Sequence, residues 1–218
     1  MLEAVIFDLD GVIVDSEHVW DSAREALARE HGGRWHERAQ RDIMGMSSLE
    51  WSRYMHDIVG LSEPPEEISA EVVRRLGAIY REELPLIEGA PEAVTRLAER
   101  WPLAVASSSN RPIIDLVLEL SGLERYFRAT VSSEEVARGK PAPDVYLEAT
   151  RRLGAEPTRS AAVEDSRNGI LSAKAAGMRV VAIPNLLYPP GEEALGSADV
   201  VLGSIAELTP EAVEKDAT

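Results

Sequence analysis

From residue 88 onward the chain alternates short apolar runs with amphipathic stretches, and this alternation constrains its fold more than any other feature. Short runs rich in Val and Ala are typical of buried strands, whereas apolar residues that recur every three or four positions are typical of helices. Strands joined by helices run parallel, and the helices then cover both faces of the sheet. We expect helices at 91–100, 112–120, 144–153 and 166–176, and strands at 103–106, 129–131, 161–163, 179–183 and 199–202. The expected fold class is α/β, with a doubly wound parallel sheet.

A first strand is expected at residues 4–7, and two carboxylates follow it. Asp8 and Asp10 lie two positions apart, so their side chains leave an extended backbone on the same side, and Gly11 permits a sharp turn behind them. Two carboxylates this close repel each other unless a cation is near. A hard divalent cation such as Mg²⁺ would be held by one of them while the other handles protons. A solvated turn is the competing interpretation of this motif taken alone.

Residues 16–86 show helical patterns with no strand between them. We expect a helical domain at residues 16–86, inserted into an α/β core that comprises residues 1–15 and 87–218. The last residues, 209–218, are expected to be a frayed terminus. The helices are expected at 16–30, 49–59 and 68–83, separated by breaks at Gly32-Gly33, at residues 44–48 and at Pro64-Pro65.

The chain is strongly acidic, with a net charge of −15 over 218 residues. A phosphate backbone would be repelled by this charge, so we expect no nucleic-acid partner. No apolar run approaches the roughly 20 residues of a membrane span, and a chain without Cys forms no disulfide. We therefore expect a cytoplasmic protein, without a membrane partner, that is a monomer or a homodimer.

Polar residues follow the predicted strands, at the sheet edge where folds of this class bind their ligands. Two strands end in Ser107-Ser108-Ser109-Asn110 and in Glu164-Asp165-Ser166, and Lys140 lies between these segments in a Gly-Lys-Pro setting. With the N-terminal aspartates they bring carboxylates, hydroxyls and an ammonium to one edge. Phosphoryl transfer needs these groups. The competing interpretations are helix capping by the serines and a solvated loop lysine.

Four segments together resemble the four motifs of the haloacid dehalogenase superfamily, and they occur in the order of that family. They are Asp8-Leu9-Asp10-Gly11-Val12, Ser107, Lys140-Pro141 and Glu164-Asp165-Ser166. The helical insertion that follows the first motif is similar to the cap of the β-phosphoglucomutase and phosphoglycolate phosphatase branch. The resemblance spans nearly the whole chain.

The resemblance implies a catalytic role for four residues. Asp8 would be the nucleophile that forms an aspartyl-phosphate. Asp10 would be the general acid and base, which protonates the leaving alcohol and then activates water. Ser107 would hydrogen-bond the transferring phosphoryl group, and Lys140 would neutralise both that group and Asp8.

The resemblance also implies the ligands of Mg²⁺ and a set of substrate contacts. Asp8 and Asp165 would bind the metal directly, Asp10 through its backbone carbonyl, and Glu164 directly or through water. Arg24, Met44, Met46 and Trp51 either face the substrate or pack within the cap, and packing is favoured for Trp51. The expected substrate contacts are Ser107, Ser108, Asn110, Lys140, Trp20, Arg24, Met44 and Ser47.

Several chemistries occur in this superfamily, and particular residues distinguish them. Relatives that displace halide lack the second aspartate of the first motif, whereas Asp10 is present here. Phosphonatase relatives use a cap lysine, and residues 16–86 contain none. Mutase relatives carry a histidine where this chain has Trp20. We therefore expect a phosphatase that acts on a small phosphorylated sugar or organic acid, with a phosphosugar mutase as the alternative and a non-catalytic phosphate-binding module as a weaker one.

Overall fold

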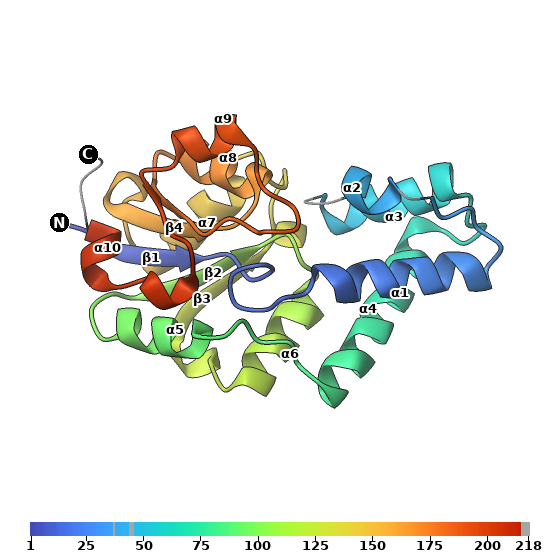
Figure 1. Cartoon of the computed structure of the whole chain (residues 1–218), viewed down its shortest axis with the longest axis horizontal. Helices are drawn as coiled ribbons and strands as arrows, with labels where there is room; N and C mark the ends of the chain where they lie inside the picture. The colour runs from blue at the N-terminus through green and yellow to red at the C-terminus, as the bar shows by residue number, and fades with distance from the viewer. Residues whose placement is uncertain (37, 44–45, 215–218) are drawn as a thin grey trace.

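A six-stranded, fully parallel sheet lies at the centre of the α/β part of the molecule (Figure 1). The structure is a computed structural model that describes residues 1–36, 38–43 and 46–214. The strand order is β3-β2-β1-β4-β5-β6, which confirms the predicted α/β class and the doubly wound parallel sheet. The strands are β1 (Ala4–Phe7), β2 (Leu103–Ser107), β3 (Phe127–Ser132), β4 (Ser160–Glu164), β5 (Arg179–Ala182) and β6 (Val200–Val201).

Helices cover both faces of this sheet, because successive residues of each buried strand point to opposite sides. Val5 and Phe7 pack into one apolar cluster with α5 and α6, whereas Ala4 and Ile6 pack into another with α7 and α8. The flanking helices are α5 (Ala90–Ala98), α6 (Arg111–Ser121), α7 (Asp144–Leu153), α8 (Arg167–Ala175), α9 (Glu192–Ser197) and α10 (Pro210–Glu214). Short 3₁₀ turns occur at Glu124–Tyr126, Ser133–Glu135, Pro157–Arg159 and Ile205–Glu207.

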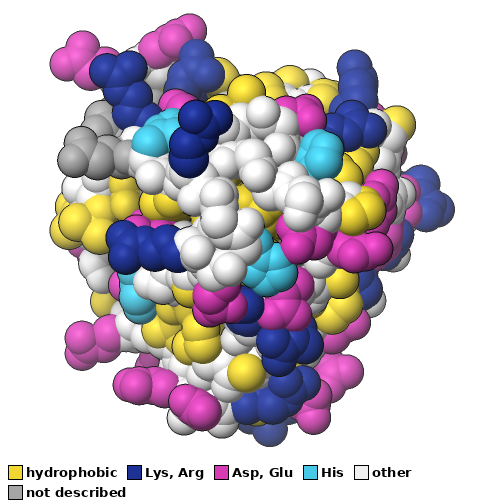
Figure 2. All heavy atoms as spheres, turned by 90° about the vertical axis from the view of Figure 1, so that its right-hand side faces the viewer, with side chains coloured by type: hydrophobic (Ala, Val, Ile, Leu, Met, Phe, Trp, Pro, Cys, Tyr) yellow, Lys and Arg dark blue, Asp and Glu magenta, His cyan; other side chains and the backbone are white. Residues whose placement is uncertain are grey.

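A group of helices extends from the carboxyl edge of the sheet and forms the right-hand side of Figure 1. It comprises α1 (Glu17–Glu30), α2 (Ala39–Ile43), α3 (Ser48–Tyr54), a π-helical segment at Met55–Val59 and α4 (Pro65–Glu82). The predicted helices at 16–30, 49–59 and 68–83 are confirmed, with α2 as an addition. Figure 2 shows basic and acidic side chains interspersed over the end of this group. Among the helices of the group, Arg75 forms an ion pair with Glu30 and Arg74 forms one with Glu71.

The chain enters and leaves this helical group through two adjacent segments. The backbone N–H of Asp15 donates to the carbonyl of Pro85 (2.8 Å), and that of Ile87 donates to the carbonyl of Ile13 (3.0 Å). Val14 and Leu86 form an antiparallel bridge between them. One apolar cluster runs from the sheet into α1, α3 and α4, so packing alone draws no boundary. The division into residues 16–86 and the remainder therefore stays a prediction.

The expectation of a frayed terminus at 209–218 was wrong for residues 210–214. These residues form α10, in which Val213 is fully buried and Glu214 forms a 3.0 Å ion pair with Arg100. One buried apolar side chain and one ion pair hold this turn against the sheet layer. Residues 215–218 lie outside the described part. None of the helices in the described residues is long and apolar enough to cross a membrane.

Candidate active site

Asp8 lies directly after β1 and forms the centre of a buried cluster of charged side chains. Its side chain is almost fully buried, and Lys140 Nζ lies 2.9 Å from Asp8 Oδ1 and 2.6 Å from Glu164 Oε1. Burial raises the pKa of Asp8 to about 8, although the ammonium of Lys140 opposes this rise. Burial disfavours the charge of Lys140, yet the two carboxylates raise its pKa above the usual value. Lys140 therefore remains a cation beside Asp8.

Glu164, the last residue of β4, is held by five hydrogen-bond donors. Its Oε1 accepts hydrogen bonds from Lys140 Nζ (2.6 Å) and from the hydroxyl of Tyr146 on α7 (2.7 Å). Its Oε2 accepts from the backbone N–H groups of Asp165 and Ser166 and from Ser166 Oγ. A side chain at position 169 is excluded, because a Cβ on Gly169 would lie 1.7 Å from Glu164 Oε1. Glu164 is thus fixed in place, with both oxygens already engaged.

Asp165 completes a group of three buried carboxylates that fits a divalent cation. One oxygen each from Asp8, Glu164 and Asp165 lies within 4.8 Å of the others. Burial raises the pKa of Asp165, and the neighbouring carboxylates Glu164 and Asp8 raise it further. The turn after β1 is built for this approach, because Gly11 has a φ of 77° and a Cβ there would lie 2.0 Å from Asp165 Oδ2. An oxygen-rich, mutually repelling donor set of this kind suits a hard divalent ion.

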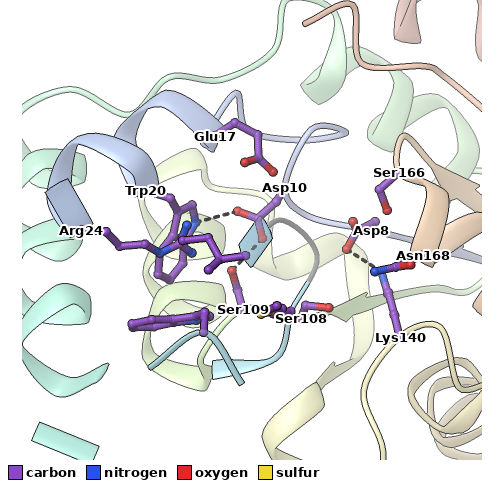
Figure 3. Close-up of a pocket in the computed structure, with 13 residues that line it drawn as sticks. Asp8, Asp10, Glu17, Trp20, Arg24, Ser108, Ser109, Lys140, Ser166 and Asn168 are labelled. Atoms are coloured by element: carbon purple, nitrogen blue, oxygen red, sulfur yellow. Dashed lines mark hydrogen bonds and ion pairs between the residues drawn. The ribbon is translucent and has the colours of Figure 1, made fainter. Parts of the chain in front are cut away.

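Asp10 lies at the meeting point of the α/β part and α1. Its Oδ1 accepts hydrogen bonds from Ser16 Oγ (2.5 Å) and Trp20 Nε1 (3.1 Å). Its Oδ2 accepts hydrogen bonds from Ser109 Oγ (2.6 Å) and Ser107 Oγ (3.3 Å). Figure 3 shows the carboxylate between Asp8 and the side chain of Trp20. Asp10 is therefore oriented by donors from two separate parts of the chain.

A small cavity of about 70 Å³ lies beside these aspartates. The α/β part contributes Asp8, Asp10, Ser108, Ser109, Lys140, Ser166 and Asn168 to its lining, and the helical segment contributes Glu17, Trp20, Arg24, Ile43, Met46 and Trp51. Burial, followed by the charge of Asp10, raises the pKa of Glu17 to about 7. The cavity thus has the carboxylates of Asp8 and Asp10 on one side and aromatic and charged side chains of the helical segment on the other.

The structure brings together most of the residues expected at this site. Asp8, Asp10, Lys140, Ser108, Trp20 and Arg24 all line the cavity, and Glu164 and Asp165 adjoin Asp8. Ser107 is fully buried behind the cavity, where its Oγ also accepts a hydrogen bond from the backbone N–H of Ser109 (2.9 Å). Glu17, Tyr146 and Asn168 were not expected at this site, and Ser109 was named only as part of the polar run after a strand.

Two expected substrate contacts lie elsewhere, in a neighbouring groove of about 720 Å³. Asn110 donates hydrogen bonds to Ser69 Oγ (3.2 Å) and Glu134 Oε1 (2.7 Å). Ser47 is the N-cap residue before α3, and its backbone N–H and Oγ both donate hydrogen bonds to the carboxylate of Glu50. In this structure neither residue lines the cavity beside Asp8. Met44 lies outside the described residues.

Comparison with known proteins gives a consistent picture. Haloacid dehalogenase-like hydrolases match this chain as a family over residues 2–177. Hexitol phosphatase B of Escherichia coli (strain K12) is 32% identical over 225 residues, which cover 94% of each chain. The phosphorylated carbohydrates phosphatase of Thermotoga maritima is 30% identical and covers 97% of this chain and 96% of that protein.

A solved structure supports the same assignment. CbbY from Rhodobacter sphaeroides, determined in complex with phosphate, superposes with a TM-score of 0.88 at 28% identity and covers 98% of this chain and 100% of its own. The family match spans the carboxylate cluster and Lys140, and the similarity to phosphatases extends over nearly the whole chain. The chain belongs to the haloacid dehalogenase-like hydrolases and is a phosphoric monoester hydrolase of that family.

Proposed function

We propose that this chain is a Mg²⁺-dependent phosphatase that hydrolyses a small phosphorylated sugar or organic acid through an aspartyl-phosphate on Asp8. One observation carries the proposal: a buried Asp8 carboxylate, ion-paired with Lys140, adjoins the same cavity as the hydrogen-bonded carboxylate of Asp10. A nucleophile and a proton carrier in one pocket are what a double displacement at phosphorus requires.

The first step forms the phosphoenzyme. A carboxylate oxygen of Asp8 attacks phosphorus, the bond between phosphorus and the ester oxygen breaks, and Asp10 gives its proton to that oxygen. Lys140 offsets the negative charge on the phosphoryl group, because its ammonium is already beside Asp8. Ser108 and Ser109 line the same cavity and offer hydroxyl donors to the phosphoryl oxygens.

The second step releases inorganic phosphate. Asp10 takes a proton from a water molecule, which attacks phosphorus, and the bond between phosphorus and the Asp8 oxygen breaks. Asp8 is again a carboxylate, and Asp10 holds the proton for the next leaving group. Asp8, Glu164 and Asp165 would hold Mg²⁺, and the family resemblance adds the backbone carbonyl of Asp10. When bound, the ion offsets the negative charge shared by the carboxylates and the phosphoryl oxygens.

The relatives favour a sugar phosphate as the substrate class. Both are named as phosphatases of sugar derivatives, a hexitol phosphatase and a phosphorylated carbohydrates phosphatase. We therefore place phosphorylated sugars and sugar alcohols first among the phosphomonoesters to be screened, followed by small phosphorylated organic acids.

Mg²⁺ is expected to switch on phosphate release and to stabilise the fold. The carboxylates of Asp8, Glu164 and Asp165 repel one another, so an ion that binds the native state relieves this repulsion. At about 100 times its dissociation constant a ligand adds about 2.7 kcal/mol to the free energy of unfolding, which corresponds to an increase in melting temperature of about 5–11 °C. Melting and phosphate release would be measured in EDTA and in Mg²⁺.

The stabilisation by Mg²⁺ should also depend on pH. Because the pKa of Asp8 is raised to about 8, a proton must leave Asp8 when the metal binds below that pH. The increase in melting temperature is therefore expected to be smaller at pH 6 than at pH 9.

Full activity in EDTA would contradict the metal-assisted mechanism.

Hydrolysis, rather than isomerisation, is expected with a mutase substrate. Trp20 occupies the position where mutase relatives carry histidine, and its Nε1 donates to Asp10. The assay supplies β-glucose 1-phosphate with glucose 1,6-bisphosphate and follows glucose 6-phosphate and inorganic phosphate together. Formation of glucose 6-phosphate much faster than phosphate would identify a mutase instead.

A further inference from the structure

In the part of the chain that the structure describes, Arg24 is a buried cation without a carboxylate ion-pair partner. Its side chain is 6% exposed, its Nε has no hydrogen-bond acceptor among the described residues, and its Nη1 donates a long hydrogen bond to Gln40 Oε1 (3.5 Å). Within residues 1–36, 38–43 and 46–214 no carboxylate forms an ion pair with it. Burial lowers its pKa to about 10, with the more distant Glu17, Asp21 and Asp10 opposing the fall, so it stays charged at neutral pH. A desolvated guanidinium in this state lacks the anion that would satisfy its charge.

Two tryptophans hold the guanidinium in place at the wall of the cavity. The Cζ atom of Arg24 lies 4.8 Å from the ring centroid of Trp20 and 5.0 Å from that of Trp51, and the two rings pack edge to face. All three residues line the cavity beside Asp8 and Asp10. Contact with aromatic faces stabilises the cation but accepts none of its planar N–H donors. The guanidinium of Arg24 therefore lines the cavity with its charge unpaired and its Nε–H donor unsatisfied among the described residues.

The position of Arg24 relates it to the leaving group. Asp10 accepts a hydrogen bond from Trp20 Nε1 (3.1 Å), and the ring of Trp20 is in contact with Arg24. Figure 3 shows Asp8 and Lys140 on one side of Asp10, with Trp20 and Arg24 on the other. Because Asp10 gives its proton to the leaving oxygen, the organic part of the substrate extends from Asp10 toward Arg24. Arg24 thus lies on the side away from the reacting phosphoryl group.

We propose that Arg24 binds a second anionic group, a carboxylate or a second phosphate, on the organic part of the substrate. This inference rests on the proposed phosphatase function and narrows its substrate class to phosphomonoesters that carry a further oxyanion. Guanidinium pairs with such groups through two parallel N–H bonds, and burial strengthens those bonds. A neutral sugar phosphate leaves the Arg24 charge unsatisfied in the closed site.

The test compares substrates that differ only in the second charge. Erythrose 4-phosphate and 4-phosphoerythronate differ by an aldehyde against a carboxylate, and fructose 1-phosphate and fructose 1,6-bisphosphate differ by one phosphate. In the wild-type protein with Mg²⁺, kcat/KM for the anionic member of one pair is expected to exceed that of the neutral member by about 10- to 100-fold. The pair with the larger ratio identifies the group as carboxylate or phosphate.

Variants then assign the preference to Arg24. Arg24→Gln is expected to bring the ratio close to one, mainly by raising KM for the anionic substrate, and Arg24→Lys should restore part of it. Arg53→Gln is the matched control, because it removes the same charge from an exposed position on α3. It should leave the ratio at the wild-type value. The melting temperature of each variant reports whether it folds.

Each outcome is distinguishable. The wild-type protein alone provides the first test. If it releases phosphate from both members of each pair with a kcat/KM ratio near one, the role of Arg24 is overturned and the phosphatase proposal stands. If a folded Arg24→Gln variant keeps a high kcat/KM ratio, another residue binds the second anionic group, and the inference is also overturned. No phosphate release from any ester in Mg²⁺ contradicts the proposed function itself.

Discussion

Asp8→Asn is expected to lower turnover by on the order of 10⁴-fold or more and to leave no covalent phosphoenzyme. An amide is a poor nucleophile, so the aspartyl-phosphate cannot form, and the remaining groups cannot replace that step. Turnover would be measured as phosphate release in Mg²⁺. The phosphoenzyme would be measured by acid quench after brief exposure to a substrate with a labelled phosphate.

Asp10→Asn is the informative control for this experiment. In the proposed mechanism Asp10 moves protons and forms no bond to phosphorus, so its loss is expected to reduce turnover by about 10²–10⁴-fold. The Asp10 variant should still bind beryllofluoride, the phosphate analogue that occupies an aspartate, whereas the Asp8 variant should not. Label retained in Asp8→Asn would show that a different residue attacks phosphorus.

Lys140→Met is expected to have the largest effect on stability. It leaves Asp8 and Glu164 buried with no cation, and breaking a buried ion pair in this way destabilises a protein by about 3–5 kcal/mol. For a chain of this size that corresponds to a decrease in melting temperature of about 6–20 °C. The raised pKa of Lys140 means that its ion pairs stabilise the fold below its ordinary pKa, so the full effect is present at pH 7.

The measurement is thermal unfolding in EDTA, where no added metal compensates for the lost ammonium. Without Lys140 the buried Asp8 carboxylate has lost the ammonium that favours its charged form, so the loss of stability should be larger at pH 8 than at pH 5. Lys174→Met is the control, because Lys174 and Asp199 form a pair of the same 2.9 Å length that is about one-third exposed. That variant should lose about 1 kcal/mol or less. Equal losses of stability in Lys140→Met and Lys174→Met would show that burial does not strengthen the contribution of the Lys140 ion pairs.

The parallel sheet could be predicted because each strand is a local apolar run and each crossover a local amphipathic one. Short elements could not. α2 spans five residues, too few for a helical period to be visible, and α10 contains a single fully buried apolar residue, Val213. Tertiary contacts decide whether such turns form, and a single sequence does not contain those contacts in readable form.

Part of the candidate site could likewise be predicted from local sequence, and part depends on tertiary contacts. Carboxylates at the ends of strands and the Gly-Lys-Pro segment are visible in the sequence, and the structure brings Asp8, Lys140 and Glu164 into contact. Which serine of the run 107–110 reaches Asp10 depends on how β2 turns into α6. Ser109 makes the shortest of these bonds, whereas Asn110 faces Ser69 and Glu134. Tyr146 supports Glu164 from α7, a contact between residues 18 positions apart that no motif indicates.

The paired segments at 13–15 and 85–87 have a consequence for how new specificities arise. Two hydrogen bonds hold the departing and returning chain side by side, so the ends of the intervening segment are neighbours in space. An insertion whose ends are adjacent can be lengthened, shortened or exchanged without displacing the strands that carry Asp8 and Glu164. Trp20, Arg24 and Trp51 all lie within this exchangeable segment, whereas Asp8, Lys140 and the acidic residues Glu164 and Asp165 lie outside it. Selection for a new substrate can therefore act on one continuous stretch of the gene while the chemistry is inherited unchanged.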